Sequence, residues 1–152
     1  MMAERDEAGF TLLEMVCALA VIALLLATVL PAFPRGTSRP QLEAYALKTA
    51  AMLKADRNAA IRRETKVATE LNTAAWSVRS GASGEVLQLP RDVGFRALIA
   101  NQCGAQSAGT SIQFLPSGMS CGGTIYLSRP GTTLEIRVTW LTGGVEIVPG
   151  SS

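Results

Sequence analysis

The chain has 152 residues, enough for one domain and too few for a multidomain enzyme or a large α/β barrel. Hydrophobic residues make up 48% of it and charged residues 17%, a balance too apolar for a disordered protein. The net charge of +2 does not favour nucleic acid as a partner, because neutralising phosphates needs a larger surplus of Lys and Arg. There is no histidine, which excludes Ser-His-Asp and Cys-His catalytic sites and most zinc sites. We therefore expect neither an enzyme nor a bound metal or cofactor.

The first element is an apolar run of 21 residues from Phe10 to Leu30, in which Glu14 is the only charged residue. A helix of that length reaches about 31 Å, close to the thickness of a bilayer's hydrocarbon core. A cleaved secretory signal is the alternative, but the region before the run is acidic and no typical cleavage site follows it. Pro31 ends or kinks the helix. The run predicts a transmembrane helix over residues 10–31.

A linker and a second helix follow. Residues 32–40 contain two prolines and a glycine, which predicts a helix-breaking linker. Residues 41–63 contain neither, and their apolar side chains recur at spacings of three and four, which predicts an amphipathic helix. We expect its core-facing stripe to consist of Leu42, Tyr45, Ala46, Thr49, Met52 and Leu53. The opposite face suits solvent better than a phosphate ligand, because its basic residues gather toward the C-terminal end, namely Lys48, Lys54, Arg57, Arg62 and Arg63.

Beyond Glu64 the sequence changes to short stretches of alternating polarity, separated by Gly, Pro and Ser, which predicts β-strands. The clearest strand has a buried face of Leu134, Ile136, Val138 and Trp140 and a solvent face of Glu135, Arg137 and Thr139. The glycines of residues 142–144 supply the positive φ for a turn into the last strand. The expected strands are 66–71, 75–79, 86–89, 95–99, 111–115, 124–127, 133–141 and 145–148. A helix packed on antiparallel sheet makes the predicted fold class α+β.

The hexapeptide Gly9-Phe10-Thr11-Leu12-Leu13-Glu14, followed by the apolar run, resembles the class III signal of type IV pilins and type II secretion pseudopilins. The resemblance implies that residues 1–9 are a leader, that a prepilin peptidase cuts between Gly9 and Phe10, and that Phe10 is then N-methylated. A proline at the place of Pro31 is also typical of this family. The resemblance further implies a pilin-like fold, with an N-terminal transmembrane helix, a short linker, and an amphipathic helix packed on antiparallel sheet.

Glu14 has two interpretations, because a carboxylate within an apolar helix costs about 2–3 kcal/mol unless it is paired or lies at the membrane interface. In the first, its side chain reaches the lipid headgroups. In the second, which the resemblance implies, it pairs with the terminal amine of a neighbouring subunit's Phe10 when the fibre assembles. The apolar helix is then a packing element as well as an anchor.

Three later segments, residues 111–118, 122–127 and 136–143, resemble the C-terminal region of GspH/FimT-type minor pseudopilins. The resemblance implies a single-pass protein of the bacterial inner membrane with residues 41–152 as a periplasmic domain. It implies as partners the other minor and major pseudopilins, the prepilin peptidase, the inner-membrane secretion platform, and the secretin or exoprotein cargo. The Lys and Arg residues oppose that orientation, because the leader is acidic and Arg35, Arg39 and Lys48 follow the apolar run.

Cys103 and Cys121 bound 17 intervening residues in the domain expected in the periplasm, where disulfides persist. A bridge there would stabilise the fold by about 3 kcal/mol, and two buried free thiols are the alternative. Cys17, inside the apolar run, is expected to be a packing residue.

Residues 118–122 match the G-x-S-x-G motif of hydrolases, but they lie between predicted strands and no histidine base exists, which favours a glycine-rich turn.

Three functions remain. The first, which we favour, is a minor pseudopilin at or near the tip of a type II secretion pseudopilus, supporting export of folded proteins across the outer membrane. The second is a minor type IV pilin of the FimT kind with a DNA-uptake role. The third is a membrane-anchored periplasmic enzyme, for which the sequence offers no paired carboxylates and no activated nucleophile.

Overall fold

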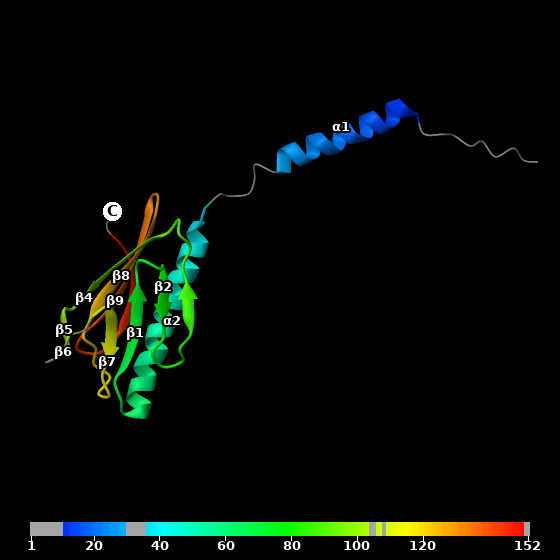
Figure 1. The fold of residues 1–152 in the computed structure, drawn as a ribbon. Helices are drawn as coiled ribbons and strands as arrows, with labels where there is room; N and C mark the ends of the chain where they lie inside the picture. Colours follow the sequence, from blue (N-terminus) through cyan, green and yellow to red (C-terminus); the bar gives the residue numbers. More distant parts are fainter. Residues whose placement is uncertain (1–10, 30–35, 104–105, 108, 151–152) are drawn as a thin grey trace, which may run out of the picture. The chain divides into compact units, whose positions relative to one another are not determined.

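The computed structural model describes residues 11–29, 36–103, 106–107 and 109–150 (Figure 1). The chain divides into two units, residues 1–35 and residues 36–152. The first unit contains α1 (Leu12–Val29), and the second contains α2 (Arg39–Arg63) and all of the described strands.

α1 begins at a capped end. The backbone N–H of Glu14 donates to the hydroxyl of Thr11 (3.3 Å) and to its carbonyl oxygen (3.0 Å), so Thr11 is the N-cap and Glu14 the third helical residue. The segment predicted as a transmembrane helix, residues 10–31, contains a helix of 18 residues, about 27 Å long. In the described part of the chain, no helix is both long and apolar enough to cross a membrane. Phe10 and Pro31 lie outside the described residues.

α2 starts two residues earlier than predicted. Ser38 is its N-cap: its hydroxyl accepts from the N–H of Gln41 (3.4 Å), and the side chain of Gln41 accepts from the N–H of Ser38 (2.9 Å). Pro40 therefore lies in the helix and not in the predicted linker, because the first turn of a helix does not use the backbone donor that proline lacks. The helix ends at Glu64, whose φ of 52° is left-handed.

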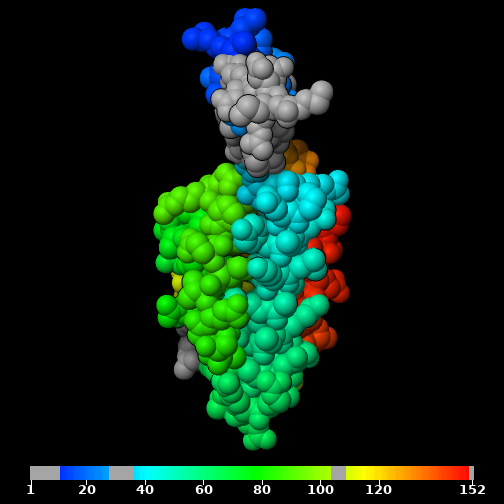
Figure 2. All heavy atoms as spheres, turned by 90° about the vertical axis from the view of Figure 1, so that its right-hand side faces the viewer, coloured from blue at the N-terminus to red at the C-terminus, as the bar shows by residue number. Residues whose placement is uncertain are grey.

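The predicted core-facing stripe of α2 is confirmed. Five of its six members are buried and Tyr45 is half-buried, the buried ones being Leu42, Ala46, Thr49, Met52 and Leu53. The opposite face of α2 is open to solvent. Figure 2 shows this face between the green segment around residues 80–95 and the red C-terminal strand.

The second unit pairs α2 with two antiparallel four-stranded sheets. The described strands are β1 (Val67–Asn72), β2 (Ser77–Arg79), β3 (Val86–Gln88), β4 (Gly94–Ile99), β5 (Gln102–Cys103), β6 (Gln106–Ser107), β7 (Ser111–Phe114), β8 (Gly123–Arg129), β9 (Thr132–Val138) and β10 (Val145–Pro149). Sheet A has the order β3-β2-β1-β7, sheet B has the order β10-β9-β8-β4, and β5 pairs with β6. α2 contacts β1 and β7 of sheet A and β8, β9 and β10 of sheet B, so one apolar core joins all three layers. The predicted α+β fold is confirmed.

The observed strands depart from prediction in several places: β2 begins two residues later than expected, and β8 is longer at both ends. β5 and β6 were not expected, because a strand of two residues is too short to show alternation. β9 ends three residues early, since the N–H of Gly143 donates to the carbonyl of Thr139 (2.8 Å) and the chain turns there. Trp140 is consequently 62% exposed and not on the buried face. Glu135, expected to face solvent, is buried and lies 3.1 Å from the guanidinium of Arg137, which supplies its counter-charge.

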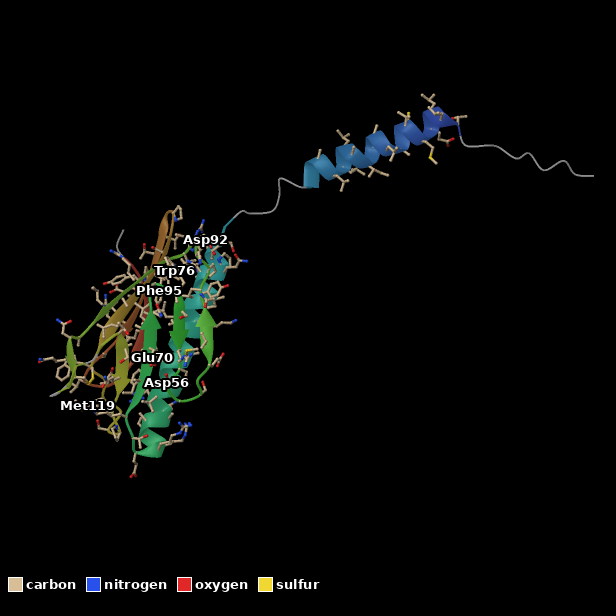
Figure 3. All side chains as sticks on the ribbon, viewed as in Figure 1. Asp56, Glu70, Trp76, Asp92, Phe95 and Met119 are labelled. Atoms are coloured by element: carbon tan, nitrogen blue, oxygen red, sulfur yellow. A yellow bond between two sulfur atoms is a disulfide. The ribbon has the colours of Figure 1, made fainter. Side chains whose placement is uncertain are left out.

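Asp56 is a carboxylate of α2 with no exposed surface, facing sheet A (Figure 3). Its Oδ2 accepts from the hydroxyl of Thr69 on β1 (2.6 Å) and from the N–H of Gly81 (3.1 Å). Its Oδ1 accepts from the hydroxyl of Ser80 and from the N–H of Ala82 (3.1 Å) in the turn after β2. A buried carboxylate is costly unless it is hydrogen-bonded, and these four donors offset that cost.

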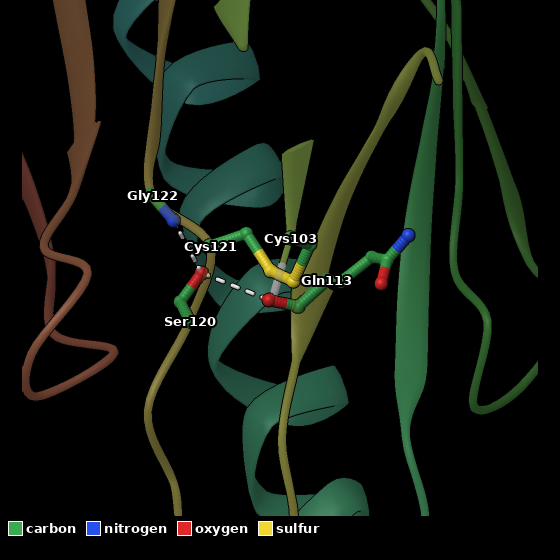
Figure 4. The surroundings of a disulfide bond; sticks show 5 residues. All are labelled: Cys103, Gln113, Ser120, Cys121 and Gly122. Carbon is green, nitrogen blue, oxygen red and sulfur yellow. Dashed lines mark hydrogen bonds between the residues drawn. A yellow bond between two sulfur atoms is a disulfide. The ribbon is translucent and has the colours of Figure 1, made fainter. Parts of the chain in front are cut away.

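The Sγ atoms of Cys103 and Cys121 are bonded, and their Cα atoms lie 5.3 Å apart, an ordinary separation for a disulfide (Figure 4). The bridge ties β5 to the segment that leads into β8. Next to it, the hydroxyl of Ser120 donates to the carbonyl of Gln113 (3.0 Å) and accepts from the N–H of Gly122 (3.1 Å). The disulfide joins the short β5–β6 pair to the rest of the unit, and the hydrogen bonds of Ser120 hold the segment before β8 against β7.

We predict that Asp56→Ala lowers the free energy of unfolding by about 3–5 kcal/mol, because it leaves two hydroxyls and two backbone N–H groups without their buried acceptor. Chemical denaturation of the purified chain measures this. Asn58→Ala, on the exposed face of the same helix, is the control and should change the value by less than about 0.5 kcal/mol. Equal effects of the two substitutions would contradict the role given to Asp56.

We predict that Cys103→Ser lowers the free energy of unfolding by about 3 kcal/mol, because the unfolded chain then loses the constraint of a loop that closes 18 positions apart. Reducing the disulfide of the unsubstituted protein should lower the free energy of unfolding by the same amount. The reductant should not change the free energy of unfolding of the variant. Cys17→Ser, in the other unit, is the control. A variant as stable as the parent would show that the bridge adds nothing.

Candidate functional site

The structure describes one of the four predicted processing and assembly residues. Gly9, Phe10 and Pro31 lie outside the described residues, whereas Glu14 lies exposed in the first turn of α1. A carboxylate there interacts favourably with the unpaired N–H groups and the positive end of the helix dipole. Glu14 thus has a local role, stabilising the start of α1, in addition to the two interpretations given above. The second role, pairing with a neighbouring subunit, remains a prediction.

The large apolar side chains of α1 are exposed. Their exposed fractions run from 53% at Ile22 to 83% at Leu12, and they occur all around the helix. A helix that is apolar on every side is stable in lipid or inside a protein assembly, and not as an isolated element in water. α1 therefore requires an apolar environment that lies beyond its own unit.

In the second unit, two consecutive residues of α2 form hydrogen bonds to the two sheets and to the turns beside them. Asp56 binds sheet A and the turn after β2, as described above. Arg57 reaches the other side, where its Nε donates to the carbonyl oxygens of Gly118 (3.0 Å) and Thr142 (3.0 Å). Gly143 has a φ of 61°, and a Cβ there would collide with the carbonyl oxygen of Gly118, so the two turns can meet at Arg57 only with glycine at this position.

Sequence reasoning missed Asp56, although a signal was present. Asp56 follows Leu53 by three positions and Thr49 by seven, so it falls on the buried stripe of α2. A carboxylate on such a stripe requires buried hydrogen-bond donors. Those donors are supplied by residues that are far away in the sequence and could not be identified from it.

The structure supports the solvated interpretation of the basic face of α2. Two of its five basic residues are used within the unit: Arg57 binds two carbonyls, and Nη1 of Arg63 donates to the carbonyl of Ala82 (3.2 Å). The remaining three, Lys48, Lys54 and Arg62, are exposed. They are too few to neutralise an extended phosphate backbone.

Asp92 fixes the point at which the chain enters the second unit. Its carboxylate accepts from the N–H of Thr37, directly before the N-cap of α2. This backbone donor, followed by the Thr37 hydroxyl, holds the pKa of Asp92 below its usual value. Figure 3 shows Asp92 at the end of the unit where α2 begins.

Two shallow grooves flank the exposed face of α2. A groove of about 350 Å³ separates it from β10 and is lined by Ala46, Leu47, Leu134, Ile147, Val148 and Pro149, together with the ion pair of Arg39 and Glu43. A groove of about 330 Å³ on the other side is lined by Lys48, Ala51, Met52, Ala55, Glu85 and Leu87. Their linings offer packing surface and not polar groups that converge on a small substrate.

The G-x-S-x-G match at residues 118–122 is a turn between strands, as predicted. β7 precedes it and β8 follows it, whereas a nucleophile elbow joins a strand to a helix. Ser120 is buried, with 5% of its surface exposed. Its hydroxyl is hydrogen-bonded to the carbonyl of Gln113 and to the N–H of Gly122. It serves the turn.

Comparisons with known families agree with this arrangement. The family described as "Type II transport protein GspH" matches residues 46–144, which covers most of α2 and every described strand except β10. The family described as "Prokaryotic N-terminal methylation motif" matches residues 5–30, which include Gly9, Phe10 and Glu14. No curated protein sequence matches the chain.

Solved structures share the fold. The minor pseudopilin EpsH from the Type 2 Secretion System of Vibrio cholerae aligns over 72% of this chain and 98% of its own, with 9% identity and a TM-score of 0.56. The type IV minor pilin FimU of Pseudomonas aeruginosa aligns over 74% of this chain and 92% of its own, with 17% identity and a TM-score of 0.56. At these identities the likeness establishes a pilin-like fold, and the family match establishes the rest: the chain belongs to the GspH family of type II transport proteins, as a GspH-type minor pseudopilin.

Proposed function

We propose that the chain works in a type II secretion system, at or near the tip of the pseudopilus, where it supports the export of folded proteins across the outer membrane. The match of residues 46–144 to the GspH family, preceded by the methylation motif, carries this proposal. The exposed apolar surface of α1 supports it as well, because a fibre subunit exchanges a lipid environment for contacts with neighbouring helices.

In this proposal a prepilin peptidase removes residues 1–9 and methylates Phe10. The segment that begins there then holds the subunit in the inner membrane, with residues 41–152 in the periplasm, until it joins other minor and major pseudopilins on the secretion platform. The secretin and exoprotein cargo are further partners. The distribution of Lys and Arg opposes this orientation, so the orientation depends on family membership alone.

A minor type IV pilin is the second candidate, and the likeness to FimU keeps it open. Both roles use the same helix, the same processing and the same fold. Deleting the gene separates them: loss of exoprotein secretion with normal pili supports the first role, and loss of pili with normal secretion supports the second.

We predict that mass spectrometry of the membrane-extracted protein finds a mature chain that begins with N-methylated Phe10. Gly9→Ala should abolish this product, because the class III signal that the chain resembles is cut directly after its glycine. A host without the peptidase is the control for the unprocessed mass. A chain that retains its leader where the peptidase is active would contradict the proposal.

We predict that Glu14→Leu leaves cleavage intact but reduces incorporation into pseudopili and secretion. In the assembled fibre the substitution removes one partner of a desolvated ion pair, a loss of about 3–5 kcal/mol at that contact. Secretion and co-purification of other pseudopilins are measured at matched expression. If α1 were only an anchor, removing the charge would leave both unchanged.

Thr11→Val is the matched control, because it removes the hydroxyl that caps α1 and leaves the carboxylate of Glu14 in place. We expect it to have a much smaller effect than Glu14→Leu. Equal losses from both substitutions would assign Glu14 to helix capping and not to pairing between subunits.

A further inference from the structure

Strand β4 forms one edge of sheet B, and one of its two sides is open (Figure 1). The order of the sheet is β10-β9-β8-β4, and β8 pairs with all six residues of β4. Among the described residues, no backbone group outside β8 forms a hydrogen bond with the backbone of β4. Half of the backbone N–H and C=O groups of an edge strand point away from its sheet, and a further strand can bind them. We call this open side the β4 edge.

The other three edges of the two large sheets are short or covered. β3 has only three residues. β7 has residues 119–121 along its edge, where the N–H of Cys121 donates to the carbonyl of Gln113 (3.0 Å). β10 contacts α2 and ends with Pro149, which has no N–H to donate. Natural sheets protect their edges in these ways, so an uncovered edge of six residues favours pairing with another chain.

A hollow of about 620 Å³ runs along the β4 edge. It is lined by four consecutive residues of β4, namely Phe95, Arg96, Ala97 and Leu98. Phe95 and Ala97 pack on the core, whereas Arg96 and Leu98 are exposed on the opposite face of the sheet. A hollow on one face would touch only every second residue of a strand, so this hollow lies beside β4, at the place of a further strand. Its volume is within the range of about 300–1,000 Å³ that is usual for ligand sites.

Arg96 gives the β4 edge a positive charge. Its guanidinium lies 5.7 Å from the centre of the Tyr126 ring on β8, a cation–π contact that favours this position of the side chain. Among the described residues, no carboxylate lies within ion-pair distance of Arg96, and Glu135, in the same row across the sheet, is paired with Arg137. A strand added beside β4 would place a side chain directly opposite Arg96, where a carboxylate would form a cross-strand ion pair.

A second copy of this chain fits the β4 edge poorly. If two β4 strands paired in antiparallel orientation with their exposed faces on the same side, the two Arg96 side chains would lie opposite each other or on a diagonal. Like charges in these positions destabilise a pair of strands. The charge that opposes self-association, a common role of charged residues on edge strands, therefore also favours a strand that carries a carboxylate.

We propose that the β4 edge binds an extended peptide segment of another protein as a further strand of sheet B. A carboxylate of the segment lies opposite Arg96, and an apolar side chain lies opposite Leu98, which is 64% exposed. Main-chain hydrogen bonds supply the affinity, and these two side-chain positions supply the preference for sequence. The segment comes from outside any folded sheet, because its own backbone groups must be unpaired. The proposal does not depend on the proposed secretion role, since it needs only the described residues of the second unit.

The test uses the purified full chain in detergent micelles, with empty micelles as the blank, and a labelled peptide, Leu-Val-Glu-Val-Leu, with both ends blocked. Its sequence reads alike in both directions, so it suits a parallel or an antiparallel strand. The same peptide with lysine in place of glutamate should bind at least about tenfold more weakly. Equal affinities of the two peptides, or no binding at about 1 mM peptide, would overturn the proposal.

Two further versions of the glutamate peptide test the backbone contacts. Each carries methyl groups on alternate backbone nitrogens, in one frame or the other, which removes those donors and leaves the side chains unchanged. A strand with its glutamate on the exposed face offers only one of its edges to β4, so only one frame should weaken binding, by about tenfold or more. Equal affinities of the two methylated peptides would contradict strand pairing.

Arg96→Glu tests the charge from the protein's side. It should reverse the preference, so that the lysine peptide binds at least about tenfold more tightly than the glutamate peptide. Arg79→Glu is the matched control, because it makes the same change at an exposed position of β2, which lies inside sheet A, and it should keep the parent preference. The same preference in both variants, or tighter binding of both peptides by Arg96→Glu, would overturn the proposal.

Amide hydrogen exchange locates the bound peptide and needs no substitution. Saturation of the parent chain with the glutamate peptide should slow exchange within residues 94–99 of β4 and leave the three residues of β3 unchanged. Slower exchange at β3, or no change at β4, would overturn the proposal. Failure of these tests leaves the proposed secretion role intact, because that role is measured by processing and secretion.

Discussion

The hydrogen bonds of the buried carboxylate of Asp56 are the constraint on which the rest of the second unit depends. Apolar contacts attract α2 to the sheets, but they are not directional and would tolerate small rotations and shifts of the helix. The four donors around Asp56 tolerate neither, since a small shift would leave a buried charge without partners. They fix α2 against β1 and against the turn after β2.

Arg57 extends this constraint to the second sheet. Consecutive helical residues point about 100° apart, so Asp56 and Arg57 face different sheets from the same turn of α2. Through the carbonyls of Gly118 and Thr142, Arg57 sets the positions of the loops on either side of β8 and β9. Trp140 lies in the second of these loops, where its carbonyl accepts from the N–H of Ser120 and its side chain is exposed.

The two units of the chain differ in how they are stabilised. The second unit has its own core, an internal disulfide and capped helix ends, and it satisfies its buried polar groups with its own residues. α1 has an N-cap but exposes its large apolar side chains. Such a division suits an assembly subunit, because one part must be stable before assembly while the other obtains its packing from lipid and from neighbouring chains.

The sequence by itself determined the features that depend on neighbouring residues: the apolar run, the buried stripe of α2, most of the strands, the turn at Gly143 and the processing motif. Only the tertiary structure decided the burial of Asp56 and Glu135, the exposure of Trp140, and the β5–β6 hairpin. The physical reason is that burial of a charge depends on where its partners lie. For Asp56 these are 13 to 26 positions away, and for the loop beside Trp140 the anchoring contact to Arg57 spans 85 positions. Spacing along a chain indicates which face a residue occupies, but distant contacts decide whether that face is covered.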